Sequence, residues 1–170
     1  MTLHIVATGG TFDKHYDAFS GELGFAESHL QAMIERARIT LGVAIEVLPL
    51  LDSLDMQDAD RRRILARCEL ASESSIVVVH GTDTLCETAQ LLGASSLTRS
   101  DSLKRVVLTG AMIPYEIENS DALFNLGFAC AVAQLASPGV HVAMNGHIFP
   151  WDQVHKNRAV GVFEPGYRAK

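Results

Sequence analysis

The sequence predicts an α/β protein of three layers, in which helices cover both faces of a doubly wound, mostly parallel sheet of the Rossmann-like or flavodoxin-like type. Five short apolar runs rich in valine, isoleucine and leucine alternate with four segments of helical period. The run at 76–79 is apolar without interruption, which is typical of a strand covered on both faces. Repeated strand–helix–strand units of this kind predict parallel pairing with right-handed crossovers.

The first half of the chain supplies two strands and two helices. Residues 3–8 form a β-rich run, and 43–50 mix valine, isoleucine and leucine, so each predicts a strand. Between them, 27–41 place apolar residues at spacings of three and four, which predicts a helix. Residues 58–71 show the same spacing and predict a second helix.

The second half repeats the alternation. After the strand at 76–79, residues 84–97 predict a helix with several apolar positions available for packing. A fourth strand is expected at 106–109, and 121–136 predict an apolar helix with few charges. A break at Pro138 and Gly139 then separates this helix from a fifth strand at 140–144.

Two segments fall outside this alternation. Residues 13–26 lie between a strand and a helix and hold two glycines, Tyr16 and Phe19. A loop of this length in a compact domain is usually a functional lid or a mobile segment. The tail after Phe149 has weak periodicity and receives no assignment.

Length and composition narrow the classes of protein. The 170 residues fit one domain, and 48% hydrophobic with 20% charged residues is ordinary globular usage. The net charge is −6, and the longest basic run is the triplet at 61–63, so we expect no nucleic-acid partner. No apolar stretch approaches 18 residues, so we expect no membrane partner either.

The cysteines and histidines give no sign of a disulfide framework or a metal centre. Cys68, Cys86 and Cys130 form no CxxC pair, which predicts buried thiols in a reducing compartment. No signal peptide precedes the first strand, so a cytoplasmic location is expected. The seven histidines form no HExxH motif or close ligand set, and His80 is expected to be a packed strand residue. We therefore expect no metal and no cofactor.

Two threonine-bearing strand ends are the features that point to chemistry. The first strand ends in Thr-Gly-Gly-Thr at 8–11, and the third in His-Gly-Thr-Asp-Thr at 80–84. Taken singly, these are more often a tight turn and a helix N-cap. Parallel strands end at the same edge of a sheet, so these two segments would lie close together. They would supply a threonine hydroxyl, an aspartate carboxylate and backbone N–H groups made accessible by glycine, which are the groups that acyl chemistry requires. A nucleotide-binding domain is disfavoured, since neither GxGxxG nor a P-loop lysine follows.

Together, the two strand ends resemble those of the bacterial-type L-asparaginases, a family of amidohydrolases whose amino-terminal domain carries TGGT and HGTDT segments. The resemblance continues to the carboxyl end of the chain. Four further segments carry it: Ser53-Leu-Asp-Met56, Val107-Leu-Thr-Gly-Ala-Met-Ile-Pro114, Ser120-Asp-Ala-Leu-Phe-Asn-Leu126 and Val142-Ala-Met-Asn145.

The resemblance implies a catalytic role for five residues. Thr11 corresponds to the nucleophile, whose hydroxyl needs activation to attack a carboxamide. Tyr16, in the lid-like segment, would accept or relay its proton, a packing role being the alternative. Thr82, Asp83 and Lys156 correspond to a second group that handles water and protons, with the Thr82 N–H as an oxyanion donor. For Lys156, an ordinary surface position is an equal alternative.

The resemblance also implies a substrate pocket, with Ser53 binding the α-carboxylate and Asp83 the α-ammonium. The family usually has glutamine after that serine, and this chain has Leu54. Loss of one polar contact to a charged ligand costs about 1 to 3 kcal/mol, which bears on the preference for free asparagine. The expected substrate-binding residues are Gly10, Ser53, Leu54, Gly81, Thr82, Asp83 and Ala111.

The resulting expectation is a single amidohydrolase domain that converts L-asparagine and water to L-aspartate and ammonia through a Thr11 acyl-enzyme, with L-glutamine as a minor substrate. A catalytically weak amino-acid-binding module is the alternative. Full-size members of the family have a second, carboxyl-terminal domain, and this sequence ends at Lys170 where that domain would begin. The surface normally covered by that domain predicts a homodimer or a higher homo-oligomer.

Overall fold

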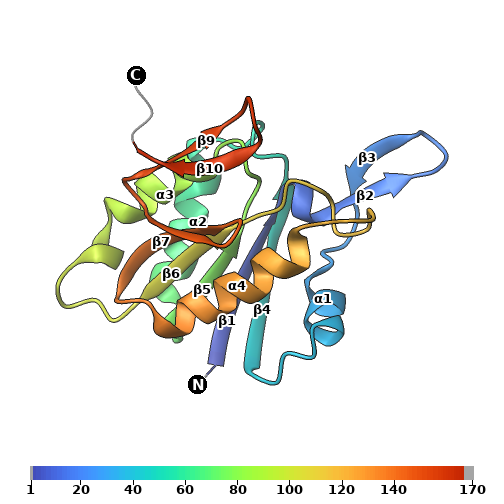
Figure 1. The fold of residues 1–170 in the computed structure, drawn as a ribbon. Helices are drawn as coiled ribbons and strands as arrows, with labels where there is room; N and C mark the ends of the chain where they lie inside the picture. Colours follow the sequence, from blue (N-terminus) through green and yellow to red (C-terminus); the bar gives the residue numbers. More distant parts are fainter. Residues whose placement is uncertain (1, 167–170) are drawn as a thin grey trace.

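A six-stranded sheet with helices on both faces forms the centre of the protein (Figure 1). The computed structural model describes residues 2–166. The first five strands in the sheet order are parallel, and the last pairs antiparallel at the edge. In sheet order they are β4 (Gly42–Leu51), β1 (Thr2–Gly9), β5 (Ser75–Val79), β6 (Arg105–Thr109), β7 (Gly139–Met144) and β8 (His147–Pro150). Numbered one to five along the chain, the parallel strands β1, β4, β5, β6 and β7 lie in the order 2-1-3-4-5, as in flavodoxin. This order confirms the predicted doubly wound class.

Four α-helices connect these strands, as the periodicity predicts, but two of them are shorter than expected. The helices are α1 (Leu30–Arg36), α2 (Asp58–Leu70), α3 (Leu85–Gly93) and α4 (Ala122–Leu135). Helix α1 ends early because Arg38 adopts a left-handed backbone with φ of 53°. Beyond α3 the chain forms a separate 3₁₀ turn, η2 (Ser96–Thr98), in which the Ser95 hydroxyl accepts the Leu97 N–H. Within residues 2–166, none of the helices has the length and apolar character needed to cross a bilayer.

The two faces of the sheet build two separate apolar cores. One core packs α2 and α3 onto the side chains of Val6, Ile76, Val78 and their neighbours, and the other packs α1 and α4 onto Ile5, Val77 and theirs. Alternate residues of each central strand contribute to opposite cores, as the two-residue period of a strand requires. The uninterrupted apolar run at 76–79 is therefore explained, because both of its faces are covered.

The crossover from β6 through α4 to β7 has the opposite hand to the others. The hand of a crossover depends on the direction of the step along the sheet and on the face that its helix covers. The steps from β4 to β5, β5 to β6 and β6 to β7 all run in the same direction, but α4, which makes the last step, lies on the face opposite α2 and α3. The connection through α1 steps the other way on the α4 face, so it has the same hand as those through α2 and α3. Since right-handed crossovers are the rule, α4 makes the left-handed one, and the expectation that all crossovers are right-handed is wrong here.

Two antiparallel hairpins stand outside the main sheet, and the sequence periodicity predicts neither. Residues expected to form a lid-like loop instead form β2 (Lys14–Asp17) and β3 (Glu22–Phe25), a hairpin that projects from the body (Figure 1). Asp17 closes it by accepting hydrogen bonds from the Phe19 N–H and the Ser20 hydroxyl. The tail forms a second hairpin from β9 (Val154–Asn157) and β10 (Val162–Pro165). Such short hairpins are set by turn chemistry and tertiary contacts rather than by a long apolar pattern.

The tail is held against the body through Trp151, the one tryptophan of the chain. Its ring packs so closely on α3 that a Cβ added to Gly93 would overlap it. Val154 and Phe163, from β9 and β10, enter the same core as α2 and α3. Glycine at position 93 thus allows the β9–β10 hairpin to dock on the carboxyl edge of the sheet.

The substitution of glycine by alanine is expected to have opposite effects in two helices. At Gly127 in α4, an added Cβ meets no other atom, so Gly127→Ala should raise the free energy of unfolding by about 1 kcal/mol through helix propensity. Gly93→Ala should lower it by about 1 to 3 kcal/mol, because the Trp151 ring must move. Urea unfolding followed by Trp151 fluorescence measures both, and equal effects at the two sites would contradict the docking of Trp151 on α3.

Candidate active site

The carboxyl ends of β1 and β5 meet through backbone alone. β1 lies between β4 and β5, so the chain leaves β1 and β5 in opposite directions, at the switch point where doubly wound proteins bind ligands. Gly10, just after β1, has a φ of 71°, and a Cβ added there would overlap the backbone of Gly81, just after β5. Only glycine permits both the conformation and the contact.

Glycine residues also allow the ends of β4 and β6 to lie close to this contact. A Cβ on Gly81 would lie 2.6 Å from Cβ of Ser53, which follows β4. A Cβ on Gly110, which follows β6, would overlap the backbone of His80. Four consecutive strand ends of the sheet therefore approach one another closely around Gly81.

Thr11 and Thr82 flank this backbone contact, one residue beyond each glycine. Thr11 opens a short 3₁₀ turn, η1 (Thr11–Asp13), and is half-buried, whereas the next side chain, Phe12, is fully buried in the α1–α4 core. Thr82 is buried. The structure thus brings the two threonines of the sequence motifs to one edge, as the parallel topology predicts.

Lys156 reaches the second of these threonines from the β9–β10 hairpin. Its ammonium donates hydrogen bonds to Oγ1 of Thr82 at 2.7 Å and to Oδ1 of Asp83 at 3.0 Å. The Lys156 side chain is only 11% exposed, so a solvated surface position, the alternative left open by the sequence, does not describe it. Arg158 adds a second cation, with Nη2 3.3 Å from the Asp83 carbonyl and 3.8 Å from its Oδ1.

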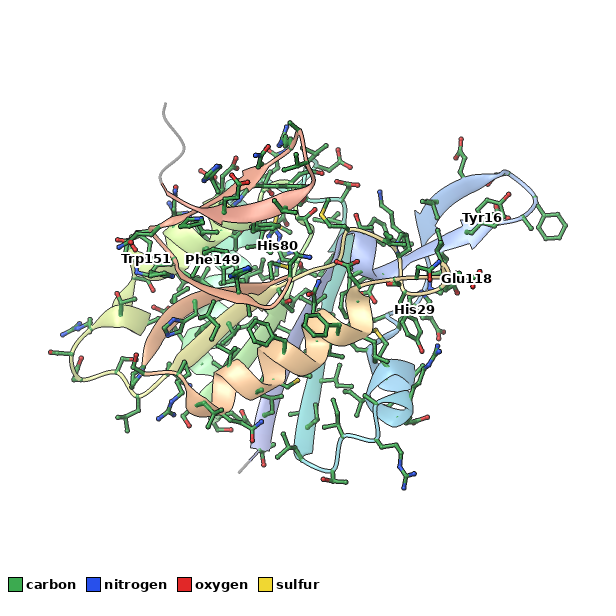
Figure 2. All side chains as sticks on the ribbon, in the orientation of Figure 1. Tyr16, His29, His80, Glu118, Phe149 and Trp151 are labelled. Atoms are coloured by element: carbon green, nitrogen blue, oxygen red, sulfur yellow. The ribbon has the colours of Figure 1, made fainter. Side chains whose placement is uncertain are left out.

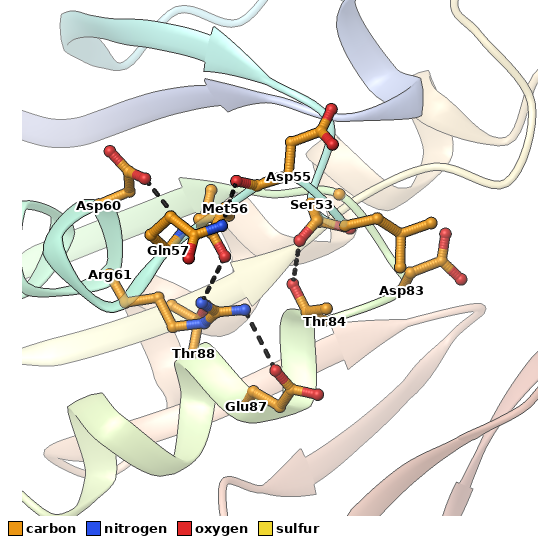
Figure 3. Close-up of polar contacts among 12 residues, drawn as sticks. Ser53, Asp55, Met56, Gln57, Asp60, Arg61, Asp83, Thr84, Glu87 and Thr88 are labelled. Carbon is orange, nitrogen blue, oxygen red and sulfur yellow. Dashed lines mark hydrogen bonds and ion pairs between the residues drawn. The ribbon is translucent and has the colours of Figure 1, made fainter.

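The loop after β4 is fixed by hydrogen bonds from two helices (Figure 3). Thr84 stands at the N-cap of α3, but its hydroxyl donates to the Ser53 carbonyl at 2.8 Å instead of capping the helix. Arg61 of α2 donates to the Met56 carbonyl at 2.8 Å and pairs with Glu87 at 3.1 Å. Ser53 is buried, whereas the next residue, Leu54, has 63% of its surface exposed.

A charged pair closes one side of this loop. Lys14, at the start of β2, donates to Oδ2 of Asp52 at 2.6 Å. Partial burial alone would raise the pKa of Asp52, but the hydrogen bonds from Lys14 and from the Leu54 N–H outweigh it, so the pKa is lowered and the carboxylate is charged. The positive charge of Lys156 acts in the same direction.

His80 is a neutral structural residue beneath the site. Nδ1 lies 2.7 Å from the Gly81 carbonyl, an acceptor, so Nδ1 carries the proton, and Nε2 accepts from the Thr88 hydroxyl at 2.8 Å. Complete burial lowers the pKa of His80 to about 4, against an upward effect of the Gly81 hydrogen bond. The expectation of a packed strand histidine fits this position.

The loop after β6, which holds Ala111, is anchored on α4. Ala111 is fully buried. The Asp121 carboxylate accepts hydrogen bonds from the N–H groups of Met112 and Ile113, and Asn125 donates to the Gly110 carbonyl at 3.0 Å. This network explains why the family-like segment at 120–126 accompanies the segment at 107–114.

Tyr16 lies apart from the strand ends. It belongs to the projecting β2–β3 hairpin, and 58% of its surface is exposed (Figure 2). Its backbone N–H donates to Oε2 of Glu116 at 3.3 Å. The hairpin therefore presents this tyrosine to solvent, and contact with Thr11 requires movement of the hairpin toward the sheet.

Sequence reasoning missed three residues that contribute charge to the site: Lys14, Asp52 and Arg158. Arg158 lies in the turn just after β9, and no pattern in the sequence points to it. Asp52 immediately precedes the motif that begins at Ser53. Lys14 had no signal, because its partner is brought to it only by the hairpin.

Known proteins match this chain along most of its length. A family model described as "Asparaginase, N-terminal" matches residues 2–163. The chain belongs to the asparaginase family. An L-asparaginase of Thermococcus kodakarensis is 34% identical over 169 residues, which cover 95% of this chain and 49% of that protein. An L-asparaginase of Dirofilaria immitis is 37% identical over 125 residues, 71% of this chain and 21% of that protein.

Solved asparaginase structures share the fold over nearly the whole chain. The thermostable L-asparaginase from Thermococcus kodakarensis superposes with a TM-score of 0.84 at 29% identity, over 97% of this chain and 51% of that one. A probable cytoplasmic L-asparaginase from Campylobacter jejuni gives 0.81 at 30% identity, over 96% and 52%. This asparaginase chain therefore spans about half the length of those two structures.

Acid should destabilise the protein through His80. Its pKa is 6.5 ordinarily and about 4 in the folded state, so the unfolded chain binds the proton first as the pH falls. The contribution of His80 to the free energy of unfolding is fully present above about pH 6.5. It is lost as the pH falls toward 4, by up to about 3 kcal/mol. His29, whose pKa burial also lowers, adds to this loss.

Urea unfolding at several pH values between 7.5 and 4.5 measures this effect. His80→Gln removes the titrating group and should flatten the pH dependence, even if its stability at neutral pH is lower. A variant that kept the full loss of stability in acid would show that another group is responsible.

Proposed function

We propose that this asparaginase-family chain is an amidohydrolase that converts L-asparagine and water to L-aspartate and ammonia, with L-glutamine as a minor substrate. The observation that carries the proposal is the bridge from Lys156 Nζ to Thr82 Oγ1 and Asp83 Oδ1, set beside Thr11 by the Gly10–Gly81 contact. A nucleophilic hydroxyl next to an ordered acid–base group is the arrangement that acyl transfer requires. The relatives named as L-asparaginases support the same reaction.

In the first half-reaction, Oγ of Thr11 attacks the carbon of the side-chain carboxamide. The hydroxyl proton passes to the amide nitrogen, the C–N bond breaks and ammonia leaves an aspartyl ester on Thr11. The negative charge that develops on the carbonyl oxygen needs donors, for which we propose the Thr82 N–H beside the Gly81 turn.

In the second half-reaction, water cleaves the ester. Thr82 Oγ1, which accepts from Lys156, has its own hydroxyl proton left to orient that water. Attack on the ester carbon releases aspartate, and a water proton returns to Thr11 Oγ. Lys156 and Asp83 move this proton between them as the pair that is already in hydrogen-bond contact.

The substrate backbone would be held by groups around the same edge. Ser53 would bind the α-carboxylate, and Asp83 would bind the α-ammonium through Oδ2, since the contacts of Lys156 and Arg158 use Oδ1. Gly10, Gly81 and Ala111 would supply backbone and surface at van der Waals distance. Leu54 stands where the family usually has glutamine, and its exposed side chain offers no hydrogen bond.

Tyr16 is proposed as the group that accepts or relays the Thr11 proton once the β2–β3 hairpin closes. Hairpin closure of this kind excludes water and completes a catalytic site only after substrate binds. The exposed position of Tyr16 on a projecting hairpin leaves it free for such a motion.

Ammonia release from L-asparagine tests the reaction directly. Thr11→Ala should lower kcat/KM by at least about a thousandfold, because it removes the nucleophile. Thr40→Ala, at an exposed threonine near the opposite end of the sheet, is the matched control and should leave the rate unchanged. Absence of ammonia release by the wild type, together with saturable binding of L-aspartate in calorimetry, would favour an amino-acid-binding module instead.

Leu54 sets the expected weakness of asparagine binding. Leu54→Gln should lower KM for L-asparagine about fivefold to a hundredfold, because one polar contact is worth about 1 to 3 kcal/mol. Leu54→Met, of similar volume and without a polar group, is the control. Steady-state kinetics on both variants decide the question, and equal KM values for Gln and Met would remove Leu54 from the specificity determinants.

We further propose a homo-oligomer in a reducing compartment such as the cytoplasm. Exposed apolar side chains on α4 and the edge strand, among them Phe124, Leu135 and Ile148, would be covered by a second copy. Cys68 and Cys130 are buried thiols, and burial raises the pKa of Cys68 to about 12 and that of Cys130 to about 11, so neither is reactive. One relative is described as cytoplasmic in its name, and another as periplasmic.

A further inference from the structure

Two histidines and a glutamate meet outside the proposed active site. His15 comes from β2, His29 lies just before α1, and Glu116 comes from the loop between β6 and α4. One ligand atom of each lies within 4.8 Å of those of the other two. The two imidazole rings are 4.0 Å apart between centroids. These residue types are the usual nitrogen and oxygen ligands of a transition metal.

The orientation of the His15 ring is fixed by a backbone carbonyl. Nε2 of His15 lies 2.8 Å from the Glu27 carbonyl oxygen, which is an acceptor, so Nε2 carries a proton. Nδ1 then faces Oε1 of Glu116 at 2.9 Å. Two acceptors at this distance need a cation between them, which is either a proton on Nδ1 or a metal ion.

His29 supplies a second ring nitrogen that has no partner. The residue is 8% exposed, and its Nε2 is buried without a hydrogen bond. The ring donates its other hydrogen bond to the backbone of Lys14, so the proton is on Nδ1 and Nε2 presents a lone pair. Nε2 is 3.8 Å from the same Oε1 of Glu116, too far for a hydrogen bond. A buried acceptor left without a donor is costly, and a metal ion would satisfy it.

We propose that His15 Nδ1, His29 Nε2 and Glu116 Oε1 bind a divalent transition metal, with Zn²⁺ as the best fit. Tetrahedral ligands at about 2.1 Å from zinc lie about 3.4 Å from one another. The separations of 2.9 and 3.8 Å from Oε1 bracket that value, so small side-chain rotations suffice. Two imidazoles disfavour Ca²⁺ and Mg²⁺, which prefer oxygen. Water would complete the coordination.

The surroundings are built as metal sites generally are. Each histidine donates its other N–H to a backbone carbonyl, which fixes the tautomer that exposes the lone pair. Oε2 of Glu116 accepts the Tyr16 N–H, which leaves Oε1 for the ion. A second carboxylate, Asp13, lies close by, accepts the backbone N–H of His29 at 2.9 Å and adds negative potential.

The ion would tie the β2–β3 hairpin to the β6–α4 loop. It would therefore hold Tyr16 in its exposed position, so the hairpin closure proposed for catalysis requires release of the ion, which lies outside the threonine edge. This proposal departs from the expectation of no metal drawn from the sequence. A proton shared by His15 and Glu116 is the competing state, and it leaves His29 Nε2 unsatisfied.

Zinc binding to the untagged, metal-stripped chain tests the proposal without reference to enzyme activity. Calorimetry at pH 7.5 should show one Zn²⁺ per chain, and Co²⁺ should give the visible absorption of a site with nitrogen ligands. His15→Ala and Glu116→Ala should each weaken Zn²⁺ binding at least about tenfold. His155→Ala is the matched control, because His155 pairs with Glu164 at 3.6 Å on the other hairpin, and its affinity should equal that of the wild type.

Hydrogen exchange separates a built site from adventitious binding. Zn²⁺ should slow amide exchange in residues 14–25 of the wild type and leave exchange unchanged in Glu116→Ala. Circular dichroism of each variant verifies its fold. The proposal is overturned if the wild type binds no single equivalent, if both ligand variants retain wild-type affinity, or if His155→Ala loses affinity as they do. If the chain binds zinc but releases no ammonia from L-asparagine, the metal site is supported and the proposed hydrolase activity is contradicted.

Discussion

The contact between Gly10 and Gly81 is the constraint on which the rest of the site depends. Two strand ends meet there at backbone distance, and a side chain on Gly10 would overlap the Gly81 backbone and separate them. The contact sets Thr11 beside Thr82, and Ser53, which follows β4, packs on Gly81. Since the groups are carried on turns of a rigid parallel sheet, their placement costs no reorganisation when a ligand arrives.

Charged side chains lie above this edge of the sheet, and a neutral histidine lies beneath it. Beneath it, His80 is neutral and fully buried and serves to join the Gly81 turn to α3 through Thr88. Above it, the charged groups form pairs that reach in from the two hairpins, Lys14 with Asp52 and Lys156 with Asp83. Partly exposed pairs add little to stability. Their value lies in fixing the position of the two hairpins over the carboxyl edge of the sheet.

The left-handed crossover through α4 decides what the site can contact. By placing α4 on the same face as α1, it carries the loop after β6 toward the β2–β3 hairpin. Glu116 thereby reaches His15, and its second oxygen holds the hairpin backbone at Tyr16. A right-handed connection would have put this loop over α2 and α3, away from both histidines. An uncommon topology thus accounts for a cluster of His15, His29 and Glu116 that lies outside the threonine edge.

The sequence by itself determined the α/β class, the five parallel strands and the threonine edge, because apolar period and glycine placement are local properties that parallel topology converts into proximity. Lys156 was predicted only through the resemblance, because the β9–β10 hairpin is held by packing of Trp151, Val154 and Phe163 on elements distant in the sequence, which residue spacing does not reveal. Tertiary structure alone decided the hand of the α4 crossover, the exposed position of Tyr16 and the meeting of His15, His29 and Glu116. Each of these depends on which face of the sheet a connection takes, and hydrophobic period does not distinguish two faces that are equally apolar.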